Sequence, residues 1–136
     1  MRTPLRMLGI VAPPVAAEIA YRLWGSLGTP ATVHSRDQAV HESAIYGELE
    51  VGGERVVTYR WGNGPRVIML VHGWRSRASR FAALVTALAT PDRTIVSFDA
   101  PGNGDSMGSR VTVLDYADAI RQLGEQYRGF DVIVGH

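Results

Sequence analysis

Two residue types are missing from this chain of 136 residues. It contains no cysteine, and its fourteen basic side chains are all arginine, so lysine is absent as well. Without cysteine the chain has no disulfide, no thiolate metal site and no thiol nucleophile. Without lysine it has neither a Schiff-base lysine nor the lysine of a Walker A phosphate loop. Arginine used alone is also typical of a GC-rich genome, which favours a bacterial source.

Strong net charge and long apolar runs are missing too. The net charge is +1 at pH 7, and the residues are 46% apolar and 20% charged, as in an ordinary globular protein. Because the net charge is so weak, we expect no nucleic-acid partner. No stretch reaches the roughly 18 apolar residues of a membrane span. We therefore expect a cytoplasmic globular protein, and no motif calls for a metal or another cofactor.

The first residues allow two interpretations. A short apolar run follows Arg2 and Arg6, and Val15-Ala16-Ala17 imitates a cleavage site, so a signal peptide over residues 1–17 is one alternative. Pro13-Pro14 interrupts that run, however, and the apolar spacing beyond it favours an amphipathic helix over residues 14–25. We favour the helix.

Residues 26–43 form a polar segment without a clear period. We expect an irregular connector here, with His34 and His41 exposed to solvent. The chain then divides into an N-terminal helix and connector, residues 1–43, and a domain that occupies residues 44–136.

From residue 46 the pattern predicts strands. Residues 46–51 and 55–61 are joined by Gly52-Gly53, a hairpin signal because glycine tolerates the positive φ of tight turns. Residues 67–71 follow as a continuous apolar run, which is typical of a parallel strand covered on both faces. Residues 94–98 and 130–134 are predicted as two further strands.

Two helices are predicted between these three strands. Phe81, Leu84, Val85 and Leu88 have the spacing of an apolar helical stripe. Thr112 and Asp115 form a capping-box pattern that starts a second helix. The resulting β-α-β-α-β order implies an α/β fold with a parallel sheet and right-handed crossovers.

Unusual residues follow each of the three apolar strands. They are His72-Gly73-Trp74, then Asp99-Ala100-Pro101-Gly102-Asn103-Gly104-Asp105-Ser106, and finally Gly135-His136. Ligand sites of open α/β sheets lie at the carboxyl ends of the strands, so these three segments are the candidate site.

Taken together and in this order, the three segments resemble the α/β-hydrolase fold superfamily, in particular its esterase, lipase and epoxide-hydrolase branches. His72-Gly73-Trp74 resembles the HG-x oxyanion loop. Residues 99–106 match the D-x-P-G-x-G-x-S turn, and Gly135-His136 resembles the start of the G-H-S-x-G nucleophile elbow. The resemblance covers residues 46–136. It implies an incomplete three-layer α/β-hydrolase, with a hairpin, parallel strands and crossover helices, and with strand 67–71 beside strand 130–134.

The resemblance also implies roles for these residues. The backbone N–H of Trp74 would be one oxyanion donor, and Gly73 would let the loop turn sharply. His72 would orient that loop, and His136 would belong to the elbow, so that neither is the catalytic base. Asp99 is expected to accept backbone N–H groups and fix the turn that Pro101, Gly102, Gly104 and Ser106 complete.

By the same resemblance, the nucleophile would come immediately after His136, and the acid and base later still. Residues 1–136 are therefore expected to be inactive alone, and to need a complementing C-terminal fragment. Serine as nucleophile would imply hydrolysis of a small ester-like substrate. Aspartate would imply epoxide or carbon–halogen chemistry. The residues present leave this choice open.

Other interpretations compete. Arg75, Arg77 and Arg80 could bind an anionic substrate, or simply be solvated. Gly102, Gly104 and Gly108 could belong to a dinucleotide fingerprint, although that motif needs a helix directly beside the glycines. A non-catalytic α/β module is the remaining alternative.

Overall fold

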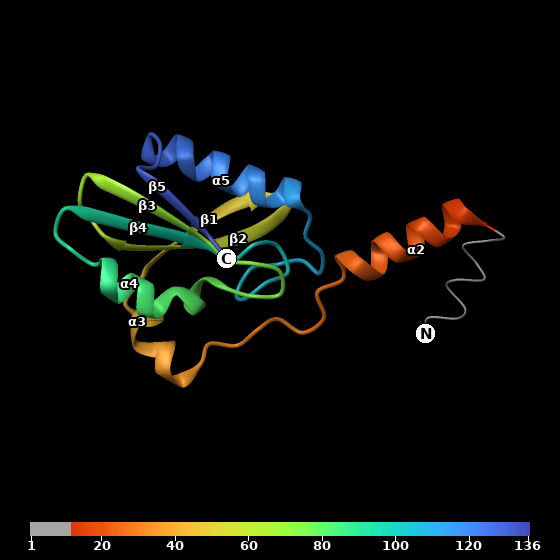
Figure 1. Ribbon diagram of the computed structural model, residues 1–136, viewed down its shortest axis with the longest axis horizontal. Coiled ribbons are helices and arrows are strands. Elements are labelled where there is room, and N and C mark those ends of the chain that lie inside the picture. The colour runs from red at the N-terminus through yellow and green to blue at the C-terminus, as the bar shows by residue number, and fades with distance from the viewer. Residues whose placement is uncertain (1–11) are drawn as a thin grey trace.

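A computed structural model describes residues 12–136 of the chain (Figure 1). The signal-peptide alternative falls largely on residues 1–11, outside the described residues. The elements, in chain order, are α2 (Pro13–Gly25), the short 3-10 helix η1 (Ser35–Asp37), α3 (Gln38–Glu42), β1 (Ile45–Val51), β2 (Glu54–Gly62), β3 (Arg66–Val71), the 3-10 helix η2 (Ala78–Phe81), α4 (Ala82–Leu88), β4 (Arg93–Phe98), α5 (Val113–Tyr127) and β5 (Val132–Gly135).

One mixed sheet organises the domain. Its strand order is β1-β2-β4-β3-β5, so β3 lies between β4 and β5 and is parallel to both. The hairpin joins the sheet through β2, which is antiparallel to β4. This topology confirms the predicted hairpin and parallel strands, including the pairing of residues 68–71 with 132–135.

Helices cover both faces of the sheet, because β3 sends alternate side chains into two separate cores. Val67 and Met69 pack in the core beneath α5, with Val96 and Leu123. Ile68 and Leu70 enter the core beneath α4, which includes Val85. Figure 1 shows α5 on one side of the sheet, with α3 and α4 on the other. The continuous apolar run thus matches a strand buried on both faces, in the three-layer arrangement that was predicted.

The start of α5 is set by local chemistry. The hydroxyl of Thr112 accepts from the Asp115 N–H at 3.4 Å, and the Asp115 carboxylate accepts from the Thr112 N–H at 2.6 Å. This is the predicted capping box. The helix ends at Tyr127, and the next residue, Arg128, has a φ of 61° that stops the helical path.

The last strand is shorter than predicted at its start. It begins at Val132, and Asp131 before it forms hydrogen bonds with Val67 near the start of β3. The Asp131 N–H donates to the Val67 carbonyl at 2.8 Å, and its carboxylate accepts from the Val67 N–H at 2.7 Å. Phe130 packs against the core beneath α5 instead of lying in the strand.

The connector is not irregular throughout, and this part of the prediction is wrong. It contains η1 and α3, which bury Asp37 and His41 and leave His34 exposed. The sequence does not reveal these two helices, because a buried helix face is recognised from the spacing of apolar residues. Here the inward face carries an acid and an imidazole.

Helix α2 projects from the body of the domain (Figure 1). Only Ala16 and Gly25 among its residues are buried. The residues after it return to the domain, where Leu27 is 3% exposed in the core beneath α5. Among residues 12–136, no helix combines the length and the apolar character needed to cross a bilayer.

Candidate functional site

The three predicted segments come together at the carboxyl ends of β3, β4 and β5. The N–H of His136 donates to the Val71 carbonyl at 3.0 Å, which continues the pairing of β5 with β3. A Cβ atom placed on Gly73 would collide with the His136 carbonyl oxygen. Only glycine lets the two backbones approach this closely. The HG-x loop and the Gly135-His136 pair are therefore direct neighbours.

His72 is a buried, neutral hydrogen-bonding group. Its Nε2 accepts from the Ala100 N–H at 2.9 Å, so the proton resides on Nδ1, which donates to the Gly73 carbonyl at 2.8 Å. Burial lowers the pKa of His72, although the bond to the Gly73 carbonyl works in the opposite direction. With both ring nitrogens occupied inside the protein, His72 links the loop after β3 to the turn after β4.

Tyr116 supports the same loop from α5. Its hydroxyl donates to the Gly73 carbonyl at 3.3 Å and lies 3.4 Å from His72 Nδ1. Burial, with a smaller contribution from the charge of Asp99, raises the pKa of Tyr116 to about 12. The hydroxyl therefore keeps its proton at neutral pH and serves as a donor.

The Trp74 ring lies at the surface, where 37% of the residue is exposed. It stacks on the Trp24 ring of α2 with centroids 4.8 Å apart. The next residue, Arg75, has a φ of 56°, a left-handed conformation that is costly for a residue with a Cβ. The Arg75 Nε–H donates to the Leu27 carbonyl at 2.9 Å. Hence the connector after α2 runs against the HG-x loop.

Asp99 organises the turn after β4. Its fully buried carboxylate accepts from the Ala78 N–H at 2.7 Å and from the Asp105 N–H at 2.9 Å. The Tyr59 hydroxyl donates to it at 2.7 Å. A Cβ on Gly104 would overlap this carboxylate, so glycine is required there. These bonds hold the turn after β4 to β2 and η2.

The rest of the turn closes on itself. The Ser106 hydroxyl donates to the Asp99 carbonyl and accepts from the Val57 N–H at 2.8 Å, which ties the turn to β2. The Gly102 N–H donates to the Met107 carbonyl at 2.8 Å, and Pro101 is buried beside it. No helix begins here, since α5 starts only at Val113. The dinucleotide alternative, which also needs Gly108 beside a helix start, lacks its geometry.

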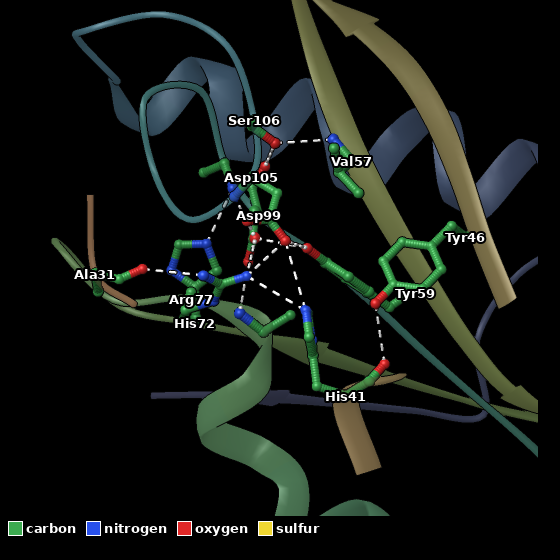
Figure 2. A network of polar contacts seen from close by, with 12 residues as sticks. Ala31, His41, Tyr46, Val57, Tyr59, His72, Arg77, Asp99, Asp105 and Ser106 are labelled. Carbon is green, nitrogen blue, oxygen red and sulfur yellow. Dashed lines mark hydrogen bonds and ion pairs between the residues drawn. The ribbon is translucent and has the colours of Figure 1, made fainter. Parts of the chain in front are cut away.

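Of the three arginines after the HG-x loop, Arg77 is buried, and for this residue the solvated interpretation is wrong. Arg77 is 3% exposed and donates to the Asp105 carboxylate at 2.7 Å, to the Asp99 carboxylate at 3.4 Å and to the Ala31 carbonyl at 3.0 Å (Figure 2). Burial acts to lower the pKa of Arg77, but the charges of Asp99 and then Asp105 outweigh it and hold the pKa above its ordinary value. The charge of Arg77 is paired with the Asp99 and Asp105 carboxylates, so it is not available to bind an anionic substrate. Arg80 is exposed.

His41 adjoins this ion-pair cluster and is buried, contrary to its predicted exposure. Its Nε2 lies 3.5 Å from the Asp105 carboxylate, and its ring meets Tyr59 with centroids 5.0 Å apart. Sequence reasoning missed His41, Tyr59 and Asp105 as members of one network. Only Asp105 carried a signal, as a variable position inside the D-x-P-G-x-G-x-S turn.

No metal site is found among residues 12–136, where no group of three or more His, Asp or Glu side chains is placed to hold an ion.

Comparison with known proteins agrees with this geometry. A family model described as serine aminopeptidase, S33, matches residues 62–130. No curated protein sequence matches the chain significantly.

Solved structures with the same fold come from several enzymes. An epoxide hydrolase from Vigna radiata superposes with a TM-score of 0.59 at 22% identity, over 71% of this chain and 32% of its own. The thioesterase domain from the curacin biosynthetic pathway gives 0.58 at 22% identity, over 68% and 37%. A lipase from Acinetobacter baumannii, itself described as putative, gives 0.53 at 19% identity, over 66% and 31%. The chain therefore spans about a third of the length of these structures, and the likeness concerns the fold.

Proposed function

We propose that this chain, which belongs to the serine aminopeptidase S33 family of α/β-hydrolases, carries the oxyanion side of a hydrolase active site whose nucleophile follows His136. The proposed reaction is hydrolysis of an ester or related acyl bond by a serine. The observation that carries this proposal is the contact of Gly73 with the His136 backbone. That contact places the loop that would stabilise an oxyanion directly beside the residue that would precede the nucleophile.

The proposed chemistry assigns a definite task to the Trp74 N–H. When a serine oxygen attacks the substrate carbonyl, the carbon–oxygen double bond opens and negative charge moves to the carbonyl oxygen. A backbone N–H waiting for that charge is worth about 3–4 kcal/mol. Among the hydrogen bonds of residues 12–136, none uses the Trp74 N–H, so it is available to a ligand. The second donor would be the N–H of the residue after the nucleophile.

His72 and Asp99 are not the base and acid in this proposal. Both ring nitrogens of His72 are occupied by backbone partners, and the Asp99 carboxylate is occupied by donors from the turn, η2 and β2. The base and acid would come from segments beyond residue 136. A hydrolase lacking these groups keeps only a partial site, so residues 1–136 alone are expected to give no turnover.

Serine is proposed over aspartate because the matching family model is one of serine enzymes. The likeness to an epoxide hydrolase, at 22% identity, supports the fold and leaves the nucleophile open. The proposed substrate is a small ester-like molecule, and the proposed partner is a complementing C-terminal segment. The arginine-only composition supports a bacterial source, and we propose a cytoplasmic location.

The test begins with the coding sequence beyond the His136 codon. We expect it to encode S-x-G next, and the extended protein to hydrolyse p-nitrophenyl acetate and butyrate. Replacing the residue after His136 with alanine should abolish that activity, while residues 1–136 alone should match the buffer rate. An aspartate codon would redirect the proposal to epoxide or carbon–halogen substrates.

A matched pair of glycine variants tests the oxyanion loop in the same assay. Gly73→Ala should lower kcat of the extended protein about 100-fold, because the added Cβ displaces the loop from the His136 backbone. Gly25→Ala is the control, since nothing lies within 4 Å of its added Cβ. Equal activity of the two variants, or turnover by residues 1–136 alone, would show that the site is misplaced.

A further inference from the structure

We propose that Arg77 is a positioning residue, which sets the Trp74 N–H by clamping the far end of the loop over residues 72–78 onto the turn over residues 99–106. The proposal extends the proposed function and rests on it for the role of Trp74. The clamp itself is a property of the described structure, because both of its ends are visible as hydrogen bonds and ion pairs.

The near end of the loop is held by His72. This residue directly follows β3, and its Nε2 accepts the Ala100 N–H at 2.9 Å. Ala100 is the second residue of the turn after β4. The first residue of the HG-x loop is thus attached to the start of that turn through a buried imidazole.

The far end of the loop is held by Arg77 and its neighbour. The Arg77 guanidinium bonds the Asp105 carboxylate at 2.7 Å and reaches the Asp99 carboxylate at 3.4 Å. The Ala78 N–H donates to the other oxygen of Asp99 at 2.7 Å. The near end of the loop is therefore attached to the turn at Ala100, and the far end is attached at Asp99 and Asp105. Figure 2 shows Arg77 beside these two carboxylates.

Between these two anchors the loop has one internal backbone hydrogen bond, and its other contacts are with the Tyr116 hydroxyl, the Trp24 ring and the Leu27 carbonyl. The Ser76 N–H donates to the Gly73 carbonyl at 3.2 Å, and Arg75 is held at a φ of 56°. A left-handed residue of this kind persists only when its surroundings impose it. Releasing the far anchor would let Arg75 relax to negative φ, and that rotation would move the N–H of Trp74.

The far anchor needs arginine in particular. Arg77 is 3% exposed and spans three acceptors, which are the two carboxylates and the Ala31 carbonyl of the connector. A planar guanidinium presents several donors in a fixed fork, whereas the single ammonium of lysine cannot reach separated acceptors at once. The Tyr59 hydroxyl donates its single proton to the Asp99 carboxylate at 2.7 Å and lies 3.1 Å from the Asp105 carboxylate, so it packs between the two acceptors.

The experiment measures hydrogen exchange of backbone amides by mass spectrometry. The sample is the protein extended beyond His136, and residues 1–136 fused to a soluble carrier protein are measured beside it. The variants are Arg77→Met, which removes the charge, Arg77→Lys, which keeps it, and Asp105→Asn, which removes one acceptor charge. Arg121→Met is the matched control, because Arg121 also bonds two carboxylates, those of Asp118 and Glu125, but on the exposed face of α5.

We expect peptides that contain residues 73–76 to exchange about tenfold faster in Arg77→Met, and by a smaller factor in Arg77→Lys and Asp105→Asn. Peptides from β3 and β4 should stay within about twofold of the unsubstituted chain in the two milder variants. Arg121→Met should leave the loop unchanged. This difference between loop and strands separates positioning from a general loss of stability.

Three outcomes would overturn the proposal. One is an unchanged loop in Arg77→Met. Another is equal acceleration of loop and strands in all three cluster variants, which would make the cluster merely structural. The third is an unprotected loop in the unsubstituted protein extended beyond His136.

The proposed function fails separately from this inference. If the extended protein shows no hydrolysis but the loop still opens in the Arg77 variants, the clamp exists without the proposed chemistry. If the extended protein hydrolyses esters and its activity and loop exchange are both insensitive to Arg77→Lys, the chemistry stands and the clamp is refuted.

Discussion

Strands β4 and β5 flank β3 on its two sides and have similar apolar sequences, yet their burial is opposite. Val96 of β4 and Ile133 of β5 both pair with Met69. Val96 is 1% exposed and Ile133 is 54% exposed. β4 is protected because β2 pairs with its other edge and both cores close over it. β5 has no strand on its other edge among residues 12–136. Apolar side chains thus favour burial in both strands, but only the strand with a neighbour on each edge and a core on each face is buried.

The largest expected effect follows from the exposed side of β5. Residues 1–136 expressed alone should self-associate or remain molten, because an uncharged apolar edge is a template for pairing with another chain. Several hundred Å² of apolar surface left in water forfeits on the order of 10 kcal/mol, at about 25 cal/mol per Å². That is comparable to the whole stability of a typical domain, about 5–15 kcal/mol.

Light scattering after gel filtration, with a thermal melt, checks this expectation. Ile133→Lys should reduce association by charging the edge, whereas Val96→Lys at the matched position should unfold the chain. A monodisperse monomer with a sharp cooperative melt and protected amides over residues 132–134 would contradict the prediction.

A smaller effect sharpens the same comparison. Val96→Ala should destabilise the fused chain by about 2 kcal/mol, because it removes two buried methyl groups and leaves a cavity. Ile133→Ala should cost less than about 1 kcal/mol, since this side chain is already half in water. Pulse proteolysis in increasing urea measures both variants in the soluble fusion. Equal costs would mean that β5 is as well covered in solution as β4.

The smallest expected effect concerns pH at the end of β4. Partial burial raises the pKa of Asp105, but the hydrogen bond and charge of Arg77 outweigh this and hold it below its usual value of 3.8. A carboxyl with a depressed pKa in the folded state stabilises the fold above its unfolded pKa, and that contribution is lost as pH falls through the folded pKa. The stability difference between the unsubstituted chain and Asp105→Asn should therefore be full at pH 6 and vanish as pH falls below about 3.8.

Urea titrations of the fused chain between pH 6 and pH 3 measure this difference. Asp118→Asn is the control, because Asp118 pairs with Arg121 on the exposed face of α5 and its contribution is screened by solvent. A pH-independent difference for Asp105→Asn would mean that the ion pair with Arg77 does not form.

Local and periodic features of the fold were predictable from sequence. The run over residues 67–71 required cover on both faces, and β3 indeed feeds two cores. Thr112 and Asp115 announced the start of α5 through a contact that spans only three residues. Such features can be predicted because the interacting groups are close in the chain, or because the spacing of apolar residues indicates which face is buried.

The candidate site was predictable only in part. The strand-end motifs placed His72, Asp99 and Gly135 in one region, since parallel strands bring their carboxyl ends to one edge. The burial of Arg77 and His41 was not predictable in this way. Arg77 lies among small and polar residues of a loop, which is the composition of a solvated segment, and its partners Asp99 and Asp105 lie far along the chain.

The sequence by itself determined the α/β class, the strand order along the chain and the three segments that could carry chemistry, because these depend on residue type, period and short-range contact. Only the tertiary structure decided which polar groups would be buried together and which apolar strand would remain exposed. Burying Arg77 is tolerable only where two carboxylates and a carbonyl already converge, and leaving Ile133 in water follows only from what lies beside it. Both outcomes depend on neighbours in space, which residue types along a chain do not specify.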